Sequence, residues 1–388
     1  MKLCEPITIR GTELKNRVVM PAIGILAMQL GLDRPTEAII DFYSKRASGG
    51  VGTIIIGGLP PSAFIPDEDL KQTIAPRLRM EALERLAARM HESGTKVGVQ
   101  LFHANLYPSG EVRSPFPQEW VAPSPRVEHH IPPLGQKMRQ LTVEEIETII
   151  SRFALAASRA KDLGADFVEF HLAHGHAQLP YQFFTPIENR RKDRYGGGSS
   201  GRMRFGLECV TAMRKAVGED YPIFVRLGAA DEAPGGVQPA DAADHAVELE
   251  RATVDCLSVS IGISSTTEHA NHVAPLKKSP MGVYVHLAEA VKKRVNIPVV
   301  AVGRINTPEV AEDILGKAQA DLVAICRQLI CDPCWVNKAA QNRSGEIVPC
   351  DSCNTYCWYR GHRKQPATHC CYKTKRPGEE WERFFPRS

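Results

Sequence analysis

Short apolar runs rich in β-branched residues recur along the whole chain, and each is followed by a longer segment in which apolar residues return at helical spacing. This alternation is typical of parallel strands joined by crossover helices. We therefore predict eight strands, at residues 17–21, 53–57, 96–102, 167–171, 223–227, 256–261, 298–302 and 322–325.

Two of the intervening segments carry clear signals for the start of a helix. Thr142 is followed three residues later by Glu145, as in a capping box, and Thr307 precedes a proline at the first helical position. Eight strand–helix units predict an α/β fold, the closed (β/α)8 TIM barrel. A doubly wound open sheet is the alternative, but it needs a glycine-rich dinucleotide loop after the first strand, which residues 20–24 do not supply.

The barrel is predicted to occupy residues 1–340, and a short cysteine-rich extension follows at residues 341–388. Two connections, at residues 103–141 and 262–281, are unusually long and leave the carboxyl end of a predicted strand. Active sites of barrels lie at that end. We interpret both connections as substrate lids.

Composition and charge narrow the class of protein. The 388 residues are 43% hydrophobic and 24% charged, and the net charge of +4 is spread without a basic run. We therefore expect a large core and neither a nucleic-acid groove nor a membrane-binding patch. The first residues carry charges and a proline where a secretory signal would be apolar, so we expect a cytoplasmic protein, a homo-oligomer whose other partners are small molecules or proteins.

Polar residues at the carboxyl ends of the predicted strands are the first candidates for chemistry. The Gln100 amide suits the edge of an isoalloxazine pyrimidine ring, and Arg226 would place positive charge near N1 and O2, where reduction deposits negative charge. Residues 303–304 and 326–327 follow the seventh and eighth strands, where barrels commonly bind phosphate. Each residue alone fits a surface charge, but together they favour a flavin site.

Cys350, Cys353 and Cys357 are spaced C-x2-C-x3-C, and Cys370 follows after twelve intervening residues. Three thiolates in one tight loop and one distant thiolate match the needs of a cubane iron–sulfur cluster. Zinc more usually binds two C-x2-C pairs. The spacing predicts a 4Fe-4S cluster in a reducing compartment, with zinc or purely structural thiols as the alternatives.

Several motifs, taken in order, resemble the old yellow enzyme family. They are residues 14–20 (LKNRVVM), 100–104 (QLFHA), 121–125 (VAPSP), 168–175 (VEFHLAHG), 189–197 (NRRKDRYGG), 225–227 (VRL), 302–304 (VGR) and 326–327 (CR). The resemblance covers essentially the whole barrel. It implies non-covalently bound FMN, held by Ala22, Ile23, Gly24, Gly58, Gln100 and Arg226, with its phosphate around Gly303, Arg304, Cys326 and Arg327.

Three histidines, His171, His174 and His176, follow the fourth predicted strand. Imidazole can donate to a carbonyl oxygen and polarise an activated alkene for hydride transfer from flavin N5, and the resemblance gives this role to His171 and His174. Relatives often have a tyrosine as proton donor two residues after the second histidine, where this chain has His176. His176, Tyr181 or water are the candidates for proton donor. The plain alternative is that these histidines are hydrogen-bonded parts of the barrel wall.

The cysteine-rich extension resembles that of the iron–sulfur branch of the family, which includes 2,4-dienoyl-CoA reductase and trimethylamine dehydrogenase. Cys370 is preferred to Cys371 as fourth ligand because the pattern continues into Tyr372. Larger relatives carry further domains for FAD or a nicotinamide dinucleotide. We expect none here, so that electrons come from, or go to, a separate redox protein or diffusing NAD(P)H.

We therefore expect an FMN- and 4Fe-4S-dependent oxidoreductase that reduces an activated C=C bond in an enone, enoate or enoyl thioester. The closest rival is a dehydrogenase or demethylase of methylated amines, which the missing tyrosine favours and the lack of an identifiable aromatic cage disfavours. A third possibility is an electron-transfer subunit without catalysis, which the retention of His171 and His174 disfavours.

Overall fold

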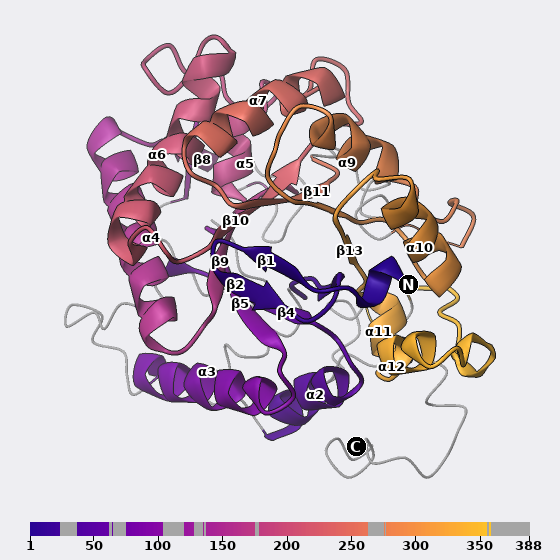
Figure 1. Ribbon diagram of the computed structural model, residues 1–388. Helices are drawn as coiled ribbons and strands as arrows, with labels where there is room; N and C mark the ends of the chain where they lie inside the picture. Colours follow the sequence, from indigo (N-terminus) through magenta and orange to yellow (C-terminus); the bar gives the residue numbers. More distant parts are fainter. Residues whose placement is uncertain are drawn as a thin grey trace.

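The computed structural model describes residues 1–23, 37–61, 64, 75–103, 120–127, 135, 137–174, 178–262, 275, 277–354 and 357. Within this part of the chain, eight parallel strands close into a barrel surrounded by helices (Figure 1), which confirms the predicted (β/α)8 fold. In chain order the strands are β3 (Val18–Met20), β4 (Thr53–Leu59), β5 (Lys96–Leu101), β9 (Phe167–Leu172), β10 (Ile223–Gly228), β11 (Cys256–Ser260), β12 (Val299–Ala301) and β13 (Leu322–Ala324).

Helices alternate with the strands and form the outer layer. They are α2 (Glu37–Ser48), α3 (Ala75–His91), α4 (Val143–Asp162), α5 (Leu179–Phe184), α6 (Ser199–Val217), α7 (Pro239–Arg251), α9 (Val285–Lys292), α10 (Pro308–Gly316), α11 (Arg327–Cys331), α12 (Trp335–Ala340) and the 3-10 turns η1 (Lys2–Cys4) and η4 (Ser344–Glu346). The predicted capping box of Thr142 and Glu145 begins α4, and the Thr307 hydroxyl caps α10. Among the described helices, none combines the length and apolar character that crossing a bilayer requires.

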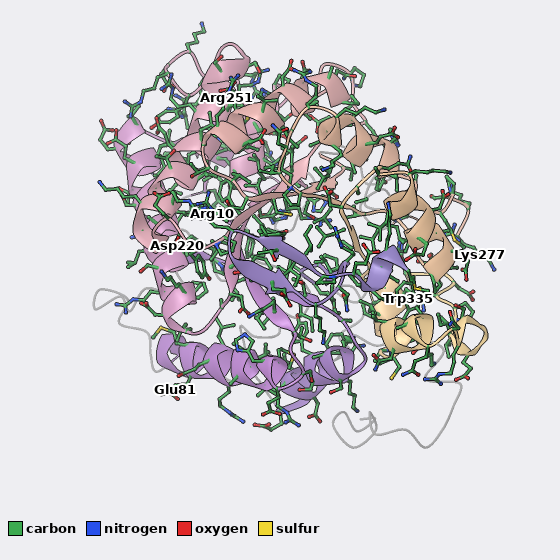
Figure 2. The ribbon with its side chains drawn as sticks, in the orientation of Figure 1. Arg10, Glu81, Asp220, Arg251, Lys277 and Trp335 are labelled. Carbon is green, nitrogen blue, oxygen red and sulfur yellow. The ribbon has the colours of Figure 1, made fainter. Side chains whose placement is uncertain are left out.

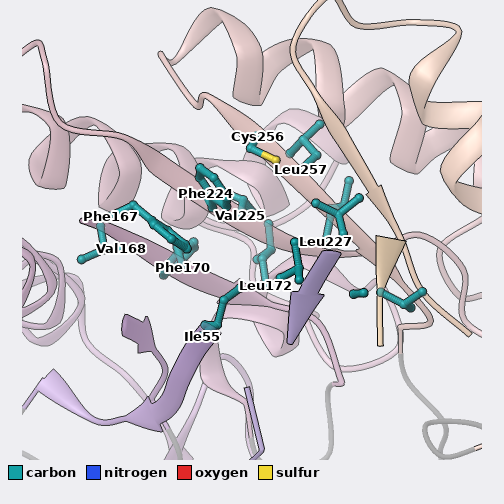
Figure 3. Close-up of a cluster of buried hydrophobic side chains, with 14 of the residues drawn as sticks. Ile55, Phe167, Val168, Phe170, Leu172, Phe224, Val225, Leu227, Cys256 and Leu257 are labelled. Atoms are coloured by element: carbon teal, nitrogen blue, oxygen red, sulfur yellow. The ribbon is translucent and has the colours of Figure 1, made fainter. Parts of the chain in front are cut away.

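The barrel interior is filled in layers of side chains, as strand alternation dictates. Phe167 on β9 and Phe224 on β10 stack with ring centroids 4.1 Å apart. Gly98 on β5 makes room for them, because a Cβ there would lie 2.2 Å from the Phe167 ring. Phe170 points outward and meets Phe153 of α4 edge to face, with centroids 5.1 Å apart. Figure 3 shows the apolar side chains of these strands packed as one cluster.

An antiparallel hairpin, β1 (Ile7–Ile9) and β2 (Thr12–Leu14), lies across the amino-terminal ends of the barrel strands (Figures 1 and 2). At its turn, Arg10 donates to Asp255, the residue before β11. Lys15 donates through Nζ to the Thr95 hydroxyl, at 3.2 Å, just before β5. The hairpin therefore closes this end of the barrel, and the chemistry is confined to the carboxyl end.

The two connections predicted to be lids lie largely outside the described residues. The described part of residues 103–141 forms a small sheet in the order β6-β8-β7, with β6 (Val121–Ala122), β7 (Arg126–Val127) and β8 (Lys137–Gln140). Arg126 of this sheet forms an ion pair of 2.6 Å with Glu188, beyond α5. The sheet is thus attached to the loops at the carboxyl end of the barrel.

Candidate functional site

The polar residues predicted at strand ends meet inside the carboxyl half of the barrel, and the register of the strands brings them together. Gln100 on β5 pairs with Glu169 on β9. Arg226 on β10 pairs with His171 on β9 and with Ser258 on β11. Because side chains alternate along a strand, these five residues share the inner face. Together with Ser260 and His174 they are called the barrel cluster below.

The charged members of the barrel cluster are buried and bound to neutral partners. Arg226 donates from Nη1 to the Ser258 hydroxyl at 3.1 Å and from Nη2 to the Ser260 hydroxyl at 3.2 Å. Glu169 Oε1 accepts from Gln100 Nε2 at 2.7 Å. Burial raises the pKa of Glu169, an effect that Arg226 opposes, and burial lowers the pKa of Arg226. The cluster therefore holds a positive charge in a site of low dielectric constant.

The two histidines lie beside this charge. Burial, and then the charge of Arg226, lower the pKa of His171 to about 3, so this ring is neutral at physiological pH. His174 follows β9 with a left-handed φ of 58°, and its Nε2 lies 3.0 Å from the Ser260 hydroxyl. The two rings meet edge to face, with centroids 5.2 Å apart. His176, the third predicted histidine, lies outside the described residues.

The barrel cluster fits the isoalloxazine ring of FMN. Oε2 of Glu169 and Nδ1 of His171 are buried and have no hydrogen-bond partner in the part of the chain that the structure describes, which is uncommon for buried polar atoms in a finished core. These atoms, with the Gln100 amide and the Arg226 guanidinium, suit a ring with N–H and C=O edges. The guanidinium also suits the negative charge that such a ring gains on reduction.

The backbone contacts predicted for FMN follow the first two barrel strands. Ala22 and Ile23 come directly after β3, and Gly24 lies outside the described residues. Gly58 lies in β4, where a Cβ would be 2.5 Å from the Phe102 ring, so glycine is required at this close approach. The predicted FMN-binding positions thus open onto the same end of the barrel as the cluster.

The arginines predicted to bind phosphate also hold the start of the cysteine-rich extension. Arg304 donates from Nε to the Ser352 hydroxyl at 3.3 Å. Arg327 donates from Nη1 to Asn354 Oδ1 at 2.7 Å. Among the described residues, neither arginine uses Nη2 in a hydrogen bond, so one donor edge of each suits a phosphate. Sequence reasoning had assigned these arginines to phosphate alone.

The other predicted phosphate-site residues lie next to these arginines. Gly303 has a left-handed φ of 118°, where a side chain would be strained and would meet Tyr284. Cys326 is half-buried at the end of β13, and burial raises the pKa of its thiol to about 11. The thiol is therefore protonated at neutral pH in the absence of a metal.

Residues 347–354, called the cysteine segment below, are tied to the barrel by side chains of the last two strand–helix units. Val348 N–H donates to Asp332 Oδ2 at 3.0 Å, and Cys350 N–H donates to Gln328 Oε1 at 2.8 Å. Asn306 donates to the Cys350 carbonyl at 3.1 Å. The beginning of the extension is therefore continuous with the barrel core, and the division at residues 340 and 341 stays a prediction.

The thiols of the extension are only partly described. Cys350 Sγ accepts from the Ser352 N–H at 3.4 Å, a contact that stabilises negative charge on sulfur. Burial and the neighbouring thiols raise the pKa of Cys357, a cost that a bound cation would remove. Within the described residues no three metal-ligating side chains are grouped for a metal ion, and Cys370 lies outside them. The iron–sulfur cluster and all four of its ligands, Cys350, Cys353, Cys357 and Cys370, therefore stay a prediction.

Tyr181, one of the candidates for proton donor, has a packing position. Its side chain on α5 is fully buried, and its hydroxyl donates to Asp231 at 2.7 Å. Thr185 donates to the other oxygen of the same carboxylate at 2.6 Å. A Cβ at Gly262 would lie 1.8 Å from the tyrosine hydroxyl, so the ring is enclosed by backbone. This arrangement favours a structural role over proton donation.

Three members of the barrel cluster were missed from the sequence: Glu169, Ser258 and Ser260. Each lies in a strand that is otherwise apolar and fully buried. Glu169 and His171 are two residues apart on β9, as are the two serines on β11. Polar residues at a spacing of two within a buried strand were the available signal, because that spacing places them on one face.

Comparisons with known proteins agree with this geometry. Residues 2–346 match the model of the family described as NADH:flavin oxidoreductase / NADH oxidase. A metal reductase of Desulforamulus reducens is 36% identical over 98% of this chain and 54% of its own length. An NADH oxidase of Thermoanaerobacter brockii is 39% identical over 89% of this chain and 51% of its own. The chain thus spans about half the length of these relatives.

Among solved structures, a 2-naphthoyl-CoA reductase in complex with 2-naphthoyl-CoA superimposes with a TM-score of 0.79. It is 26% identical to this chain, and the match covers 92% of this chain and 55% of that one. The similarity therefore extends through the whole barrel and accounts for about half of the solved protein.

Proposed function

Because the chain belongs to the NADH:flavin oxidoreductase / NADH oxidase family, that of old yellow enzyme, and is a flavin oxidoreductase, we propose that it reduces an activated carbon–carbon double bond. The observation that carries this proposal is the barrel cluster, in which the neutral His171 lies beside His174 and the buried Arg226. Family membership supports FMN as the resident cofactor and NAD(P)H as reductant.

The chain's own residues bind and polarise the substrate. FMN, when bound, supplies hydride from its N5 atom. His171 and His174 donate to the oxygen of the substrate's electron-withdrawing carbonyl, which draws electrons from the double bond towards that oxygen. The low pKa of His171, about 3, keeps the ring neutral, so that it stabilises developing negative charge without giving up its proton.

Addition to the double bond also needs a proton at the α-carbon. His176 and water remain the proposed donors. Tyr181 is the weaker candidate because Asp231 accepts its hydroxyl hydrogen. With hydride on one carbon and a proton on the other, the C=C bond becomes a saturated C–C bond and the carbonyl is restored.

We propose an α,β-unsaturated carbonyl compound as substrate: an enone, an enoate or an enoyl thioester. The imidazoles of His171 and His174 can hold one carbonyl oxygen, and the cationic Arg226 beside them disfavours a cationic amine in the same place. The similarity to a reductase that binds an acyl-CoA supports the thioester member of this class.

We further propose a 4Fe-4S cluster on Cys350, Cys353, Cys357 and Cys370. Arg304 and Arg327 join the cysteine segment to the proposed phosphate site, so both redox groups would share one support. A cluster in this place would let single electrons enter or leave the barrel, and a separate redox protein could then replace NAD(P)H as donor.

The test is an anaerobic titration of the purified holoprotein. The flavin absorbance is bleached with NADH, and 2-cyclohexenone or an enoyl-CoA is then added. We expect the oxidised flavin spectrum to return with one equivalent of alkene. Bleaching by trimethylamine, without reoxidation by any alkene, would contradict the proposal and favour an amine dehydrogenase.

Two variants sharpen this test. His171→Ala should lose reoxidation by alkene while still binding FMN. Tyr181→Phe should retain it, because the tyrosine hydroxyl is committed to Asp231. Folding of both variants is checked by circular dichroism, since Tyr181 is part of the core.

A further inference from the structure

Two serines on β11 hold the same guanidinium, but only one of them also contacts a histidine. Ser258 and Ser260 are both buried, with 2% and 3% of their surface exposed. Each accepts from one terminal nitrogen of Arg226, at 3.1 Å and 3.2 Å. The Ser260 hydroxyl also lies 3.0 Å from His174 Nε2. The strand therefore contains a matched pair that differs in one hydrogen bond.

The chemistry of the guanidinium decides the direction of these bonds. A guanidinium has hydrogens to donate and no lone pair to accept with. Ser260 Oγ is therefore an acceptor towards Arg226, and its own hydrogen is available for His174. If the neutral ring instead carried its hydrogen on Nε2, the Ser260 oxygen would accept from both Arg226 and His174, and its own hydrogen would have no acceptor among the described residues. A ring with hydrogens on both nitrogens would place a second positive charge close to the buried guanidinium, which costs free energy in a site of low dielectric constant.

We propose that Ser260 is a positioning residue for His174: its hydroxyl donates to Nε2 and so fixes the ring as the neutral tautomer that carries its hydrogen on Nδ1. This inference rests on the proposed function, because the purpose of the fixed tautomer is to hold the substrate carbonyl. Among the described residues, the Ser258 hydroxyl in the same strand bonds only Arg226.

The groups around His174 define what its titration reports. Among the described residues, His171 faces it from β9 and Arg226 from β10, with Glu169 behind Arg226. From β11 the facing group is the Ser260 hydroxyl, which carries no charge. Loss of the Ser260 hydroxyl removes a bond to the neutral form of His174, so protonation of His174 becomes easier.

The first test reads the tautomer directly and needs no turnover. Holoprotein labelled with 15N-histidine is studied by long-range proton–nitrogen correlation, and the His174 signals are identified by their absence in His174→Ala. We expect a non-protonated Nε2 in the wild type and in Ser258→Ala, and a loss of that pattern in Ser260→Ala. A wild-type Nε2 that carries hydrogen, or an unchanged pattern in Ser260→Ala, overturns the inference whether or not alkenes are reduced.

The second test uses turnover of 2-cyclohexenone. Ser260→Ala should lower kcat/KM roughly 3- to 10-fold, the size expected for one hydrogen bond, and should move the acidic limb of the pH profile to higher pH. Ser258→Ala should leave that limb in place. In the His174→Ala background the Ser260 change should have no further effect. Equal shifts in both serine variants, or additive losses, overturn the inference.

Discussion

The barrel cluster and the cysteine segment lie at the same end of the barrel but are built by different means. The cluster stands on four neighbouring strands, and the ladder register alone brings Gln100, Glu169, His171 and Arg226 together. Among the described residues no strand pairs with the cysteine segment, and side-chain bonds such as that from the Val348 N–H to Asp332 hold it. One site is positioned by backbone geometry, the other by individual hydrogen bonds.

The two regions also differ in whether their buried polar atoms have hydrogen-bond partners. In the barrel cluster, buried atoms of Glu169 and His171 lack hydrogen-bond partners among the described residues. In the cysteine segment, the buried Asn354 and Ser352 accept from Arg327 and Arg304. A rigid support can carry unsatisfied groups ready for a ligand, whereas a segment held by side chains needs its polar groups to stabilise its own position.

The largest effect is expected from Arg226, which joins the members of the barrel cluster. Arg226→Met should lower kcat/KM by roughly 10²- to 10³-fold, because a preorganised charge next to the flavin is lost. The kcat/KM of Arg226→Lys should lie between that of the wild type and that of Arg226→Met, since one ammonium cannot replace the two nitrogens that bond Ser258 and Ser260. Steady-state kinetics and flavin absorbance per polypeptide check this, and a loss below about 10-fold would mean that the cluster does not act as a unit.

A smaller effect is expected from Asp332, which stabilises the cysteine segment. Asp332→Ala leaves the Val348 N–H without its acceptor and removes one of the two acceptors of the Lys338 ammonium, which should cost about 1–3 kcal/mol in the free energy of unfolding. Iron content should fall while FMN content is kept. Urea denaturation and iron assay measure both quantities.

The matched control is the exposed ion pair between Asp313 of α10 and Lys317, the residue after that helix. Asp313→Ala should change neither the iron content nor the midpoint of urea denaturation measurably, since exposed pairs contribute little. Equal loss of FMN and iron in Asp332→Ala would show that the two regions are not independent.

The smallest effect per residue is expected from acidification, which should lower the free energy of unfolding through the buried histidines. Burial lowers the pKa of His171 to about 3 and that of His103 to about 4, against about 6.5 in an unfolded chain. Above about pH 6.5 both states are neutral and stability is at its full value. As pH falls further, the unfolded chain binds protons first, and each histidine lowers stability by up to about 1.4 kcal/mol per pH unit.

Urea denaturation between neutral pH and about pH 5 tests this slope. His103→Gln should reduce it, because one buried histidine no longer titrates on unfolding. His245 shifts in the same direction and keeps a residual slope in that variant. A stability that stays flat over this range in the wild-type protein would contradict the burial of these rings.

The strands and the polar residues that they carry could be predicted from the sequence, because both follow from a spacing of two and from β-branched composition. All eight predicted strands are present, and Gln100, His171 and Arg226 lie together as their positions at strand ends indicated. Glu169 was missed although it lies within the motif at residues 168–175, because nothing in the sequence identifies its partner. Only its bond to Gln100 reveals what it does.

Contacts made by loop residues could not be predicted from such spacing. The partners of Arg304 and Arg327 lie 48 and 27 residues further along the chain, and no periodicity links such positions. The role of Tyr181 was likewise open, because its partner Asp231 comes 50 residues later. Gly24, His176 and Cys370 lie outside the described residues, so their predicted roles stay predictions.

The hairpin β1–β2 has a kinetic consequence. Since it covers one opening of the cylinder, small molecules that reduce a flavin held by the barrel cluster and small molecules that reoxidise it share the remaining entrance. While one reactant occupies the entrance the other cannot bind, so the two reactants bind in alternation. Initial-rate plots for the two reactants should accordingly run parallel, and excess of either one should slow the cycle.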